Sequence, residues 1–487
     1  MTAGHATAAL PRLAGLPGPA RQLRRIAEDL EGGFSCVWVL PDGLVASGQA
    51  RELLEELLYD MPEVLRVPSS GQLDAPADIP FGGASQVPQF DPDTVIIDDY
   101  DDGFGGVWAQ VTVPSPSVSE RIAGQPRRPT LLERVGKEIG QITDPLGALT
   151  SPEAGCQPVI VVCGWQEPDS SDTARLLRSL SVSVKSAGLP RPRRPRALAV
   201  VRLTDLPDAV VDSLDMETTV VHWWWGTLSR LDTATVTATA RPRSRSPIGK
   251  AGHGSAAAAC HRIAEALREE VITQISGPDL NLAVCLSRDW DGVLTSLVSV
   301  LSVLSGDLRR PFPEALGRTA PVAVERPPLE LRDFWAAGAI DFWDGQLRGP
   351  LASWAITRDG RSTADLDAMI WQAQSRVLLP LIDGARAELA ALLPSAAVHG
   401  PVRLAEGYGP RGSGQGLVAG SRAAAVESLA AMEVGDIWAA VRAGQVLLPA
   451  GEVNRLKYLR LARNKLAHRC ALDDGLARDL GRALVRP

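Results

Sequence analysis

The sequence lacks the features that would carry a chain to or across a membrane. Residues 1–20 have no basic start followed by an apolar core, and no apolar stretch approaches the roughly 20 residues of a transmembrane helix. The six cysteines lie far apart, with no CxxC pair and no His/Cys cluster at zinc spacing. We therefore predict a cytoplasmic protein with buried, reduced thiols, no metal site and no membrane contact.

Familiar catalytic signatures are also missing, since no GxSxG elbow or HExxH helix occurs. The formal net charge of -7 and a pI near 5.6 argue against a protein that coats nucleic acid nonspecifically. Residues 451–487 differ, because seven Arg and two Lys stand there against one Glu and three Asp, a net of +5. Attraction of phosphate and ordinary solvated charge are both open as explanations of this basic end.

A chain of 487 residues can hold two or three domains. In its first 300 residues, short apolar stretches rich in β-formers alternate with helical ones such as 20–31, 47–59 and 172–187. This alternation predicts a mainly parallel α/β sheet. The expected strands are 34–40, 94–98, 159–164, 197–203 and 219–225.

The pattern turns wholly helical beyond the Pro-rich stretch 309–330. The expected helices there are 331–345, 364–393, 421–443 and 453–471. We therefore predict an α/β domain followed by an all-α domain. The predicted division is a flexible tail 1–20, the α/β domain 21–308, a linker 309–330 and the helical domain 331–487.

Two tryptophan-containing features precede the C-terminal end. Segments 343–348 and 371–376 share the form WxxQxR, and we interpret each Trp as a core anchor on a helix. The predicted strand 219–225 ends in His222 and three adjacent Trp. Successive strand residues point to opposite faces, so at least one Trp should meet a partner or the helical domain. His222 is interpreted as a structural histidine.

Segment 454–470 concentrates the most potential chemistry. Read as a helix, it has an apolar stripe made up of Leu459, Ala462, Leu466 and Cys470. A polar ridge faces outward and is made up of Lys457, Arg460, Asn464 and His468. Asn464 lies four residues before His468, so its amide can fix the imidazole tautomer. Arg463 is rotated by about 140° from His468, so we predict a composite site in a homodimer.

The sequence RNKLAH at 463–468 resembles the signature of the HEPN superfamily, helical domains whose motif is an Arg, a polar residue, a few spacers and a His. The resemblance covers at most the last third of the chain. Active members are metal-independent endoribonucleases that work as dimers. The resemblance thus implies catalytic roles for Arg463 and His468, with Asn464 as polar companion and RNA as substrate. Other members only bind or scaffold.

A glycine pair near the start follows the first expected strand and opens a helix, as a P-loop does. Gly43 and Gly48 have the spacing, but Gln49 and Ala50 replace the Lys and the Ser or Thr of a Walker A loop. The stretch VIIDD, with its first acid at Asp98, is similar to a Walker B strand. The region resembles P-loop ATPases of the STAND or AAA class with a degenerate site, so we expect no cofactor and no ATP hydrolysis. An unrelated α/β domain with a turn at this point is the alternative.

These resemblances predict an RNA-directed, HEPN-like effector of a bacterial conflict or phage-defence system, toxin-like in action. The first domain would sense or assemble with protein partners, and the second would cut RNA. His468 would act as general base or acid on the ribose 2′-OH and leaving oxygen, while Arg463 would stabilise charge on phosphate. The alternative is a noncatalytic adaptor or scaffold subunit of a multiprotein assembly.

Overall fold

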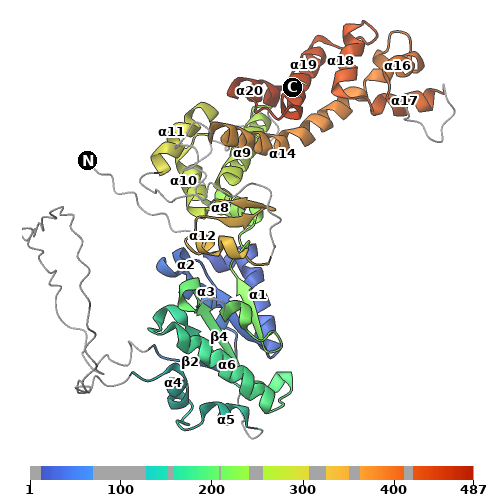
Figure 1. Cartoon of the computed structure of the whole chain (residues 1–487). Helices are drawn as coiled ribbons and strands as arrows, with labels where there is room; N and C mark the ends of the chain where they lie inside the picture. The colour runs from blue at the N-terminus through green and yellow to red at the C-terminus, as the bar shows by residue number, and fades with distance from the viewer. Residues whose placement is uncertain are drawn as a thin grey trace, which may run out of the picture.

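The structure is a computed structural model that describes residues 12–69, 128–151, 157–207, 210–240, 256–305, 325–349, 362–410 and 421–485. A parallel sheet with its helices forms one end of the molecule, and a group of helices lies beside it. A long helix, α14 (Ser362–Ala390), leads away from this group towards the last helices of the chain (Figure 1). None of the described helices is both long and apolar enough to cross a bilayer.

Among the described residues, five parallel strands form the sheet in the order β2-β3-β4-β1-β5. They are β1 (Ser35–Val39), β2 (Val64–Arg66), β3 (Val159–Cys163), β4 (Arg196–Val201) and β5 (Thr219–Trp223). Four of the five predicted strands are thereby confirmed, and the fifth, 94–98, lies outside the described residues. The sequence did not predict β2, because its three residues are partly exposed and carry no apolar stretch.

The interior strand β1, which lies between β4 and β5, is buried along its whole length, as a strand covered on both faces should be. Helices around the sheet are α1 (Pro17–Glu31), α2 (Asp42–Ala46), α3 (Gln49–Leu58), α4 (Leu131–Glu138), α5 (Pro145–Thr150), α6 (Ser170–Ser186) and α7 (Val210–Ser213). The predicted helices 20–31, 47–59 and 172–187 are confirmed by α1, α3 and α6.

The next helices lie between the sheet and the C-terminal end of the molecule. They are α8 (Arg230–Ala240), α9 (Ala256–Ser276), α10 (Leu280–Asp289) and α11 (Leu294–Ser305). All four fall inside the range predicted as the α/β domain, so that range holds a helical layer as well as the sheet.

The prediction of one helix over 331–345 is wrong. A short helix, α12 (Arg332–Ala336), is followed by an antiparallel hairpin of β6 (Asp341–Trp343) and β7 (Gln346–Arg348). Asp344 and Gly345 both have positive φ, 50° and 79°, which is the requirement of a type I′ turn. The Asp-Gly pair was therefore the hairpin signal that the helical interpretation overlooked.

The remaining helices complete the C-terminal part. They are α15 (Leu393–Ala396), α16 (Pro401–Tyr408), α17 (Arg422–Ala430), α18 (Val434–Arg442), α19 (Ala450–Ala467) and α20 (Asp474–Leu484). Two hydrophobic cores result: the first core includes buried residues up to Ala373, and the second core begins at Leu378. The two cores meet inside α14, whereas most of the predicted linker 309–330 lies outside the described residues.

The three adjacent tryptophans are all buried, in different surroundings. Trp224 contacts Trp38 of β1, with ring centroids 6.2 Å apart. Trp223 packs edge-on against Trp335 of α12, and Trp225 stacks on Phe342 of the hairpin. Two of the three thus meet the segment beyond the linker, as expected, and none is free for a partner protein.

His222 occupies a structural position, as predicted. Its Nε2 lies 3.0 Å from Asp29 Oδ2 of α1, and the side chain is mostly buried. Burial lowers the pKa of His222, against the opposing effect of the Asp29 carboxylate.

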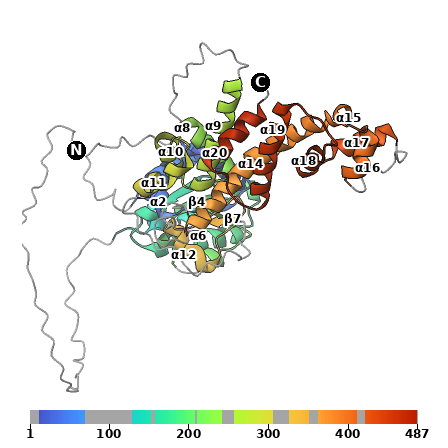
Figure 2. The ribbon, with the colours of Figure 1, turned by 90° about the horizontal axis from the view of Figure 1, so that it is seen from above.

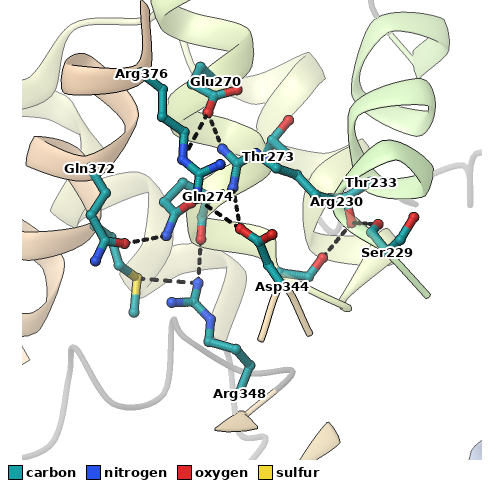
Figure 3. Close-up of polar contacts among 12 residues, drawn as sticks. Ser229, Arg230, Thr233, Glu270, Thr273, Gln274, Asp344, Arg348, Gln372 and Arg376 are labelled. Carbon is teal, nitrogen blue, oxygen red and sulfur yellow. Dashed lines mark hydrogen bonds and ion pairs between the residues drawn. The ribbon is translucent and has the colours of Figure 1, made fainter. Parts of the chain in front are cut away.

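A set of polar residues that we call the junction network joins the hairpin and α14 to α8 and α9 (Figure 3). Arg230 donates to Gln274 Oε1 at 2.6 Å and pairs with Glu270. Asp344 at the hairpin turn accepts from Arg376 of α14 at 2.9 Å and from Arg230 at 3.3 Å. The two WxxQxR segments therefore lie in unlike elements, a hairpin and a helix, and are not a structural repeat.

Candidate functional site

The site predicted from the sequence lies at the C-terminal end of α19. Leu459, Ala462 and Leu466 are buried in the second core, which confirms that part of the apolar stripe. Cys470 was predicted to continue the stripe and is instead exposed. The reason is that α19 ends at Ala467, so the helical period no longer applies to Cys470.

The chain leaves α19 through a Schellman motif. The Cys470 N–H donates to Lys465 O at 2.9 Å, and the Arg469 N–H donates to Leu466 O at 3.1 Å. Arg469 therefore takes the position that is usually glycine, with φ of 58°. We call residues 466–472 the His468 turn, because this segment contains His468, the C-capping residue of α19.

Arg463, Asn464 and His468 all come from this end of α19 but do not form a closed constellation. Arg463 Nη2 lies 3.5 Å from Glu433 Oε2, and both side chains are largely exposed. His468 is exposed and Asn464 half-buried. Within the described part of the chain, no hydrogen bond joins the Asn464 amide to the His468 imidazole, so the predicted contact is not made.

Several further cations surround the predicted site. Arg460 lies over the Trp438 ring at 5.3 Å, and Arg469 over the Trp371 ring at 5.9 Å. Lys465 pairs with Asp473 at 3.1 Å on the surface. Cations near a helix C-terminus interact favourably with the helix dipole, so this charge has a structural as well as a binding explanation.

Helix α14 holds the His468 turn from the other side. Trp371 Nε1 donates to Leu466 O at 2.7 Å. Gln374 is buried, and its amide accepts from Leu472 N at 2.6 Å and donates to Leu472 O at 2.9 Å. The sequence had indicated only a core anchor at Trp371, and the WxxQ spacing was the available signal for the role of both residues.

The P-loop-like segment has a different shape from a phosphate-binding loop. Gly43 lies inside α2, and Gly48 is the left-handed residue before α3, which begins at Gln49. The N–H groups of Leu44, Ser47 and Gly48 donate to backbone carbonyls of the same segment. A phosphate cradle needs such amides free, so this loop is a poor anion site.

At the carboxyl end of the sheet, a buried ion pair fills part of the space beside β3. Arg134 of α4 makes a two-pronged pair with Glu167, with Nη1 to Oε1 at 3.1 Å, and also donates to Pro68 O. Both side chains are almost fully buried. Asp98, the predicted Walker B acid, lies outside the described residues.

A cavity of about 1190 Å³ lies between α9, the first half of α19 and α20. Its lining is mainly apolar, with residues such as Ile263 and Leu267, and it includes neither Arg463 nor His468. Among the described residues, no group of three or more His, Cys, Asp or Glu could hold a metal ion.

Comparison with protein-family models, curated proteins and solved structures finds no match. The function must be argued from the site itself.

Proposed function

We propose that the chain is an HEPN-like, RNA-directed effector that cuts RNA without a metal at the end of α19. The observation that carries the proposal is the exposure of Arg463, near the end of α19, and of His468, on the turn that follows and whose backbone is fixed on its other side by α14. A catalytic side chain must be accessible while its backbone stays in place.

The proposed chemistry is an internal transfer at phosphorus. His468 as base would remove the proton of the ribose 2′-OH, whose oxygen then attacks the adjacent phosphate. The 5′-oxygen of the next nucleotide leaves and takes a proton from the acid. Arg463 would stabilise the negative charge that grows on the phosphate oxygens. The products are a 2′,3′-cyclic phosphate and a 5′-hydroxyl.

A second copy of the chain is part of the proposal. Arg463 is directed to Glu433, the residue that precedes α18, and is not hydrogen-bonded to the His468 side chain. Two copies that bring their α19 ends together would supply an acid and a base, one His468 from each, and two arginines. A monomer that still cuts RNA at micromolar concentration would rule out this composite site.

The test is RNA cleavage in EDTA by the purified full chain and by His468→Ala and Arg463→Ala. His399→Ala is the matched control, because His399 is also an exposed histidine of the C-terminal part. We expect both site variants to lose cleavage at least about 100-fold. Cleavage that persists in His468→Ala would refute the site.

A noncatalytic adaptor is the second candidate, favoured by the absence of any hydrogen bond that orients the His468 imidazole within the described residues. Wild type that leaves RNA intact in EDTA, while forming a complex with another protein through the α19 surface, would establish it. Trp223, Trp224 and Trp225 are buried, so they give this candidate no binding surface.

For the sheet-bearing part we propose a sensing or assembly role without ATP hydrolysis. Its support is the internal bonding of the amides between Leu44 and Gly48, together with Gln49 at the Walker lysine position. Magnesium-dependent ATP turnover that disappears in Asp98→Asn would overturn this proposal.

A further inference from the structure

A six-residue stretch of α14, residues 371–376, is bonded on two sides to different parts of the molecule. Trp371 and Gln374 contact the His468 turn. Gln372 accepts from Gln274 Nε2 at 2.6 Å, and Arg376 bonds Asp344, so these two belong to the junction network (Figure 3). At 100° per residue, the two pairs lie about 150° apart around the helix.

The same stretch of α14 also lies where the two cores meet. Ala373 is buried in the first core and Leu378 in the second. Pro380 follows within α14 and cannot donate to the carbonyl four residues earlier, so the helix is weakened just beyond this turn. Seen from above, α14 passes beside α19 and α9 (Figure 2). The contacts on both sides therefore fix α14 just before the part that Pro380 weakens.

The His468 turn needs such support. Arg469 has a left-handed backbone conformation that a residue with a Cβ adopts at a cost in free energy. Its guanidinium lies over the Trp371 ring, and Trp371 also bonds the carbonyl of Leu466. Gln374 satisfies both backbone polar groups of Leu472 inside the protein. Without these contacts, fewer interactions would restrict the His468 turn to one conformation.

We infer that Trp371 and Gln374 are positioning residues for His468, and that the junction network sets the helical turn that carries them. The conformation of the hairpin and α9 would then regulate the position of His468 through residues 371–376 of α14. Any consequence for cleavage rests on the proposed function, whereas the consequence for the backbone of the His468 turn does not.

The first experiment measures residue-resolved amide hydrogen exchange in the full chain without RNA. Trp371→Phe keeps an aromatic ring, although a smaller one, and removes the Nε1–H donor, while Gln374→Leu removes both hydrogen bonds of the side-chain amide. We expect the protection of amides 468–472 to fall about tenfold in each variant, with Leu472 most affected in Gln374→Leu. Leu379→Ala is the control, because Leu379 is exposed on the same helix.

Two results would overturn the positioning role. Unchanged protection of the His468 turn would show that the contacts do not hold it. An equal loss of protection in α17, α18 and α19 would show that the variants only weaken the second core.

The second experiment tests the junction network. Asp344→Asn keeps a residue that type I′ turns favour but removes the charge that pairs with Arg376 and Arg230. We expect about a threefold loss of protection at amides 468–472, non-additive with Trp371→Phe. Unchanged protection of amides 468–472 in Asp344→Asn would refute regulation by the junction network. So would a double variant with Trp371→Phe whose loss of protection is the sum of the two single losses.

RNA cleavage separates this inference from the proposed function. If wild type cuts RNA, Trp371→Phe should lower kcat with little change in KM, because it displaces His468 without touching substrate. A lowered exchange protection with unchanged kcat would overturn the positioning role. If wild type does not cut RNA, the proposed function fails, and the exchange results still decide the positioning of the turn.

Discussion

Asp341 at the start of the hairpin should make stability fall as pH rises. Its Oδ1 accepts from Gly226 N at 3.0 Å and from Phe342 N at 2.8 Å, which ties the hairpin to the loop after β5. The side chain is buried, and burial raises its pKa from 3.8 to about 7, against the two backbone hydrogen bonds. Asp341 is thus a carboxyl group that the fold prefers protonated.

The direction in which stability changes with pH follows from proton binding. Between pH 3.8 and about 7 the folded chain holds a proton at Asp341 that the unfolded chain has lost. Stability present below this window is therefore lost as pH rises through it. Each pH unit is worth about 1.4 kcal/mol, so the full effect is at most about 4 kcal/mol, of which roughly 2 to 3 kcal/mol fall between pH 5 and pH 8.

Asp341→Asn is the appropriate perturbation, because an amide oxygen can still accept both N–H groups while the charge is removed. Urea unfolding of the first core, followed by tryptophan fluorescence at several pH values, measures the difference from wild type. We expect Asp341→Asn to become more stable relative to wild type as pH rises from 5 to 8. Asp279 also has a raised pKa, about 6, but its contribution is common to both proteins and cancels.

Asp341→Ala completes the comparison, since it removes the acceptor at every pH and should be destabilised throughout. A difference between wild type and Asp341→Asn that stays constant from pH 5 to 8 would contradict the reasoning. A wild type that gains stability over Asp341→Asn with rising pH would show that the carboxylate itself stabilises the hairpin.

Three further outcomes are expected from substitutions in the two cores. Arg469→Gly should stabilise the second core by up to about 1 kcal/mol in urea unfolding, because glycine adopts the left-handed position freely; a loss above about 1 kcal/mol would mean that stacking on tryptophan matters more. Arg134→Ala should cost about 3 to 5 kcal/mol by leaving the Glu167 carboxylate buried and unpaired, and the added change Glu167→Leu should recover much of it; failure to recover would locate the cost in lost packing. Leu466→Ala should cost about 2 to 5 kcal/mol, whereas His468→Ala should leave the melting temperature nearly unchanged, and equal losses would make His468 structural.

The sequence alone determined the elements whose pattern is local. The strands β1, β3, β4 and β5 are short apolar stretches, and a parallel sheet buries such strands on both faces. The period of α19 likewise placed Leu459 and Leu466 inside. These predictions depend only on the spacing of neighbouring residues, which the backbone geometry converts directly into a buried face.

Tertiary structure decided everything that depends on contacts between distant segments. The hairpin is the exception, because its contacts are local and its Asp-Gly signal lay in the sequence, but its eight residues carry too little periodicity to separate strand from helix. Cys470 is exposed because α19 ends three residues before it, at Ala467. Trp371 and Gln374 reach the His468 turn across 95 and 98 residues of sequence, a pairing that depends on how α14 crosses α19 and not on any spacing along the chain.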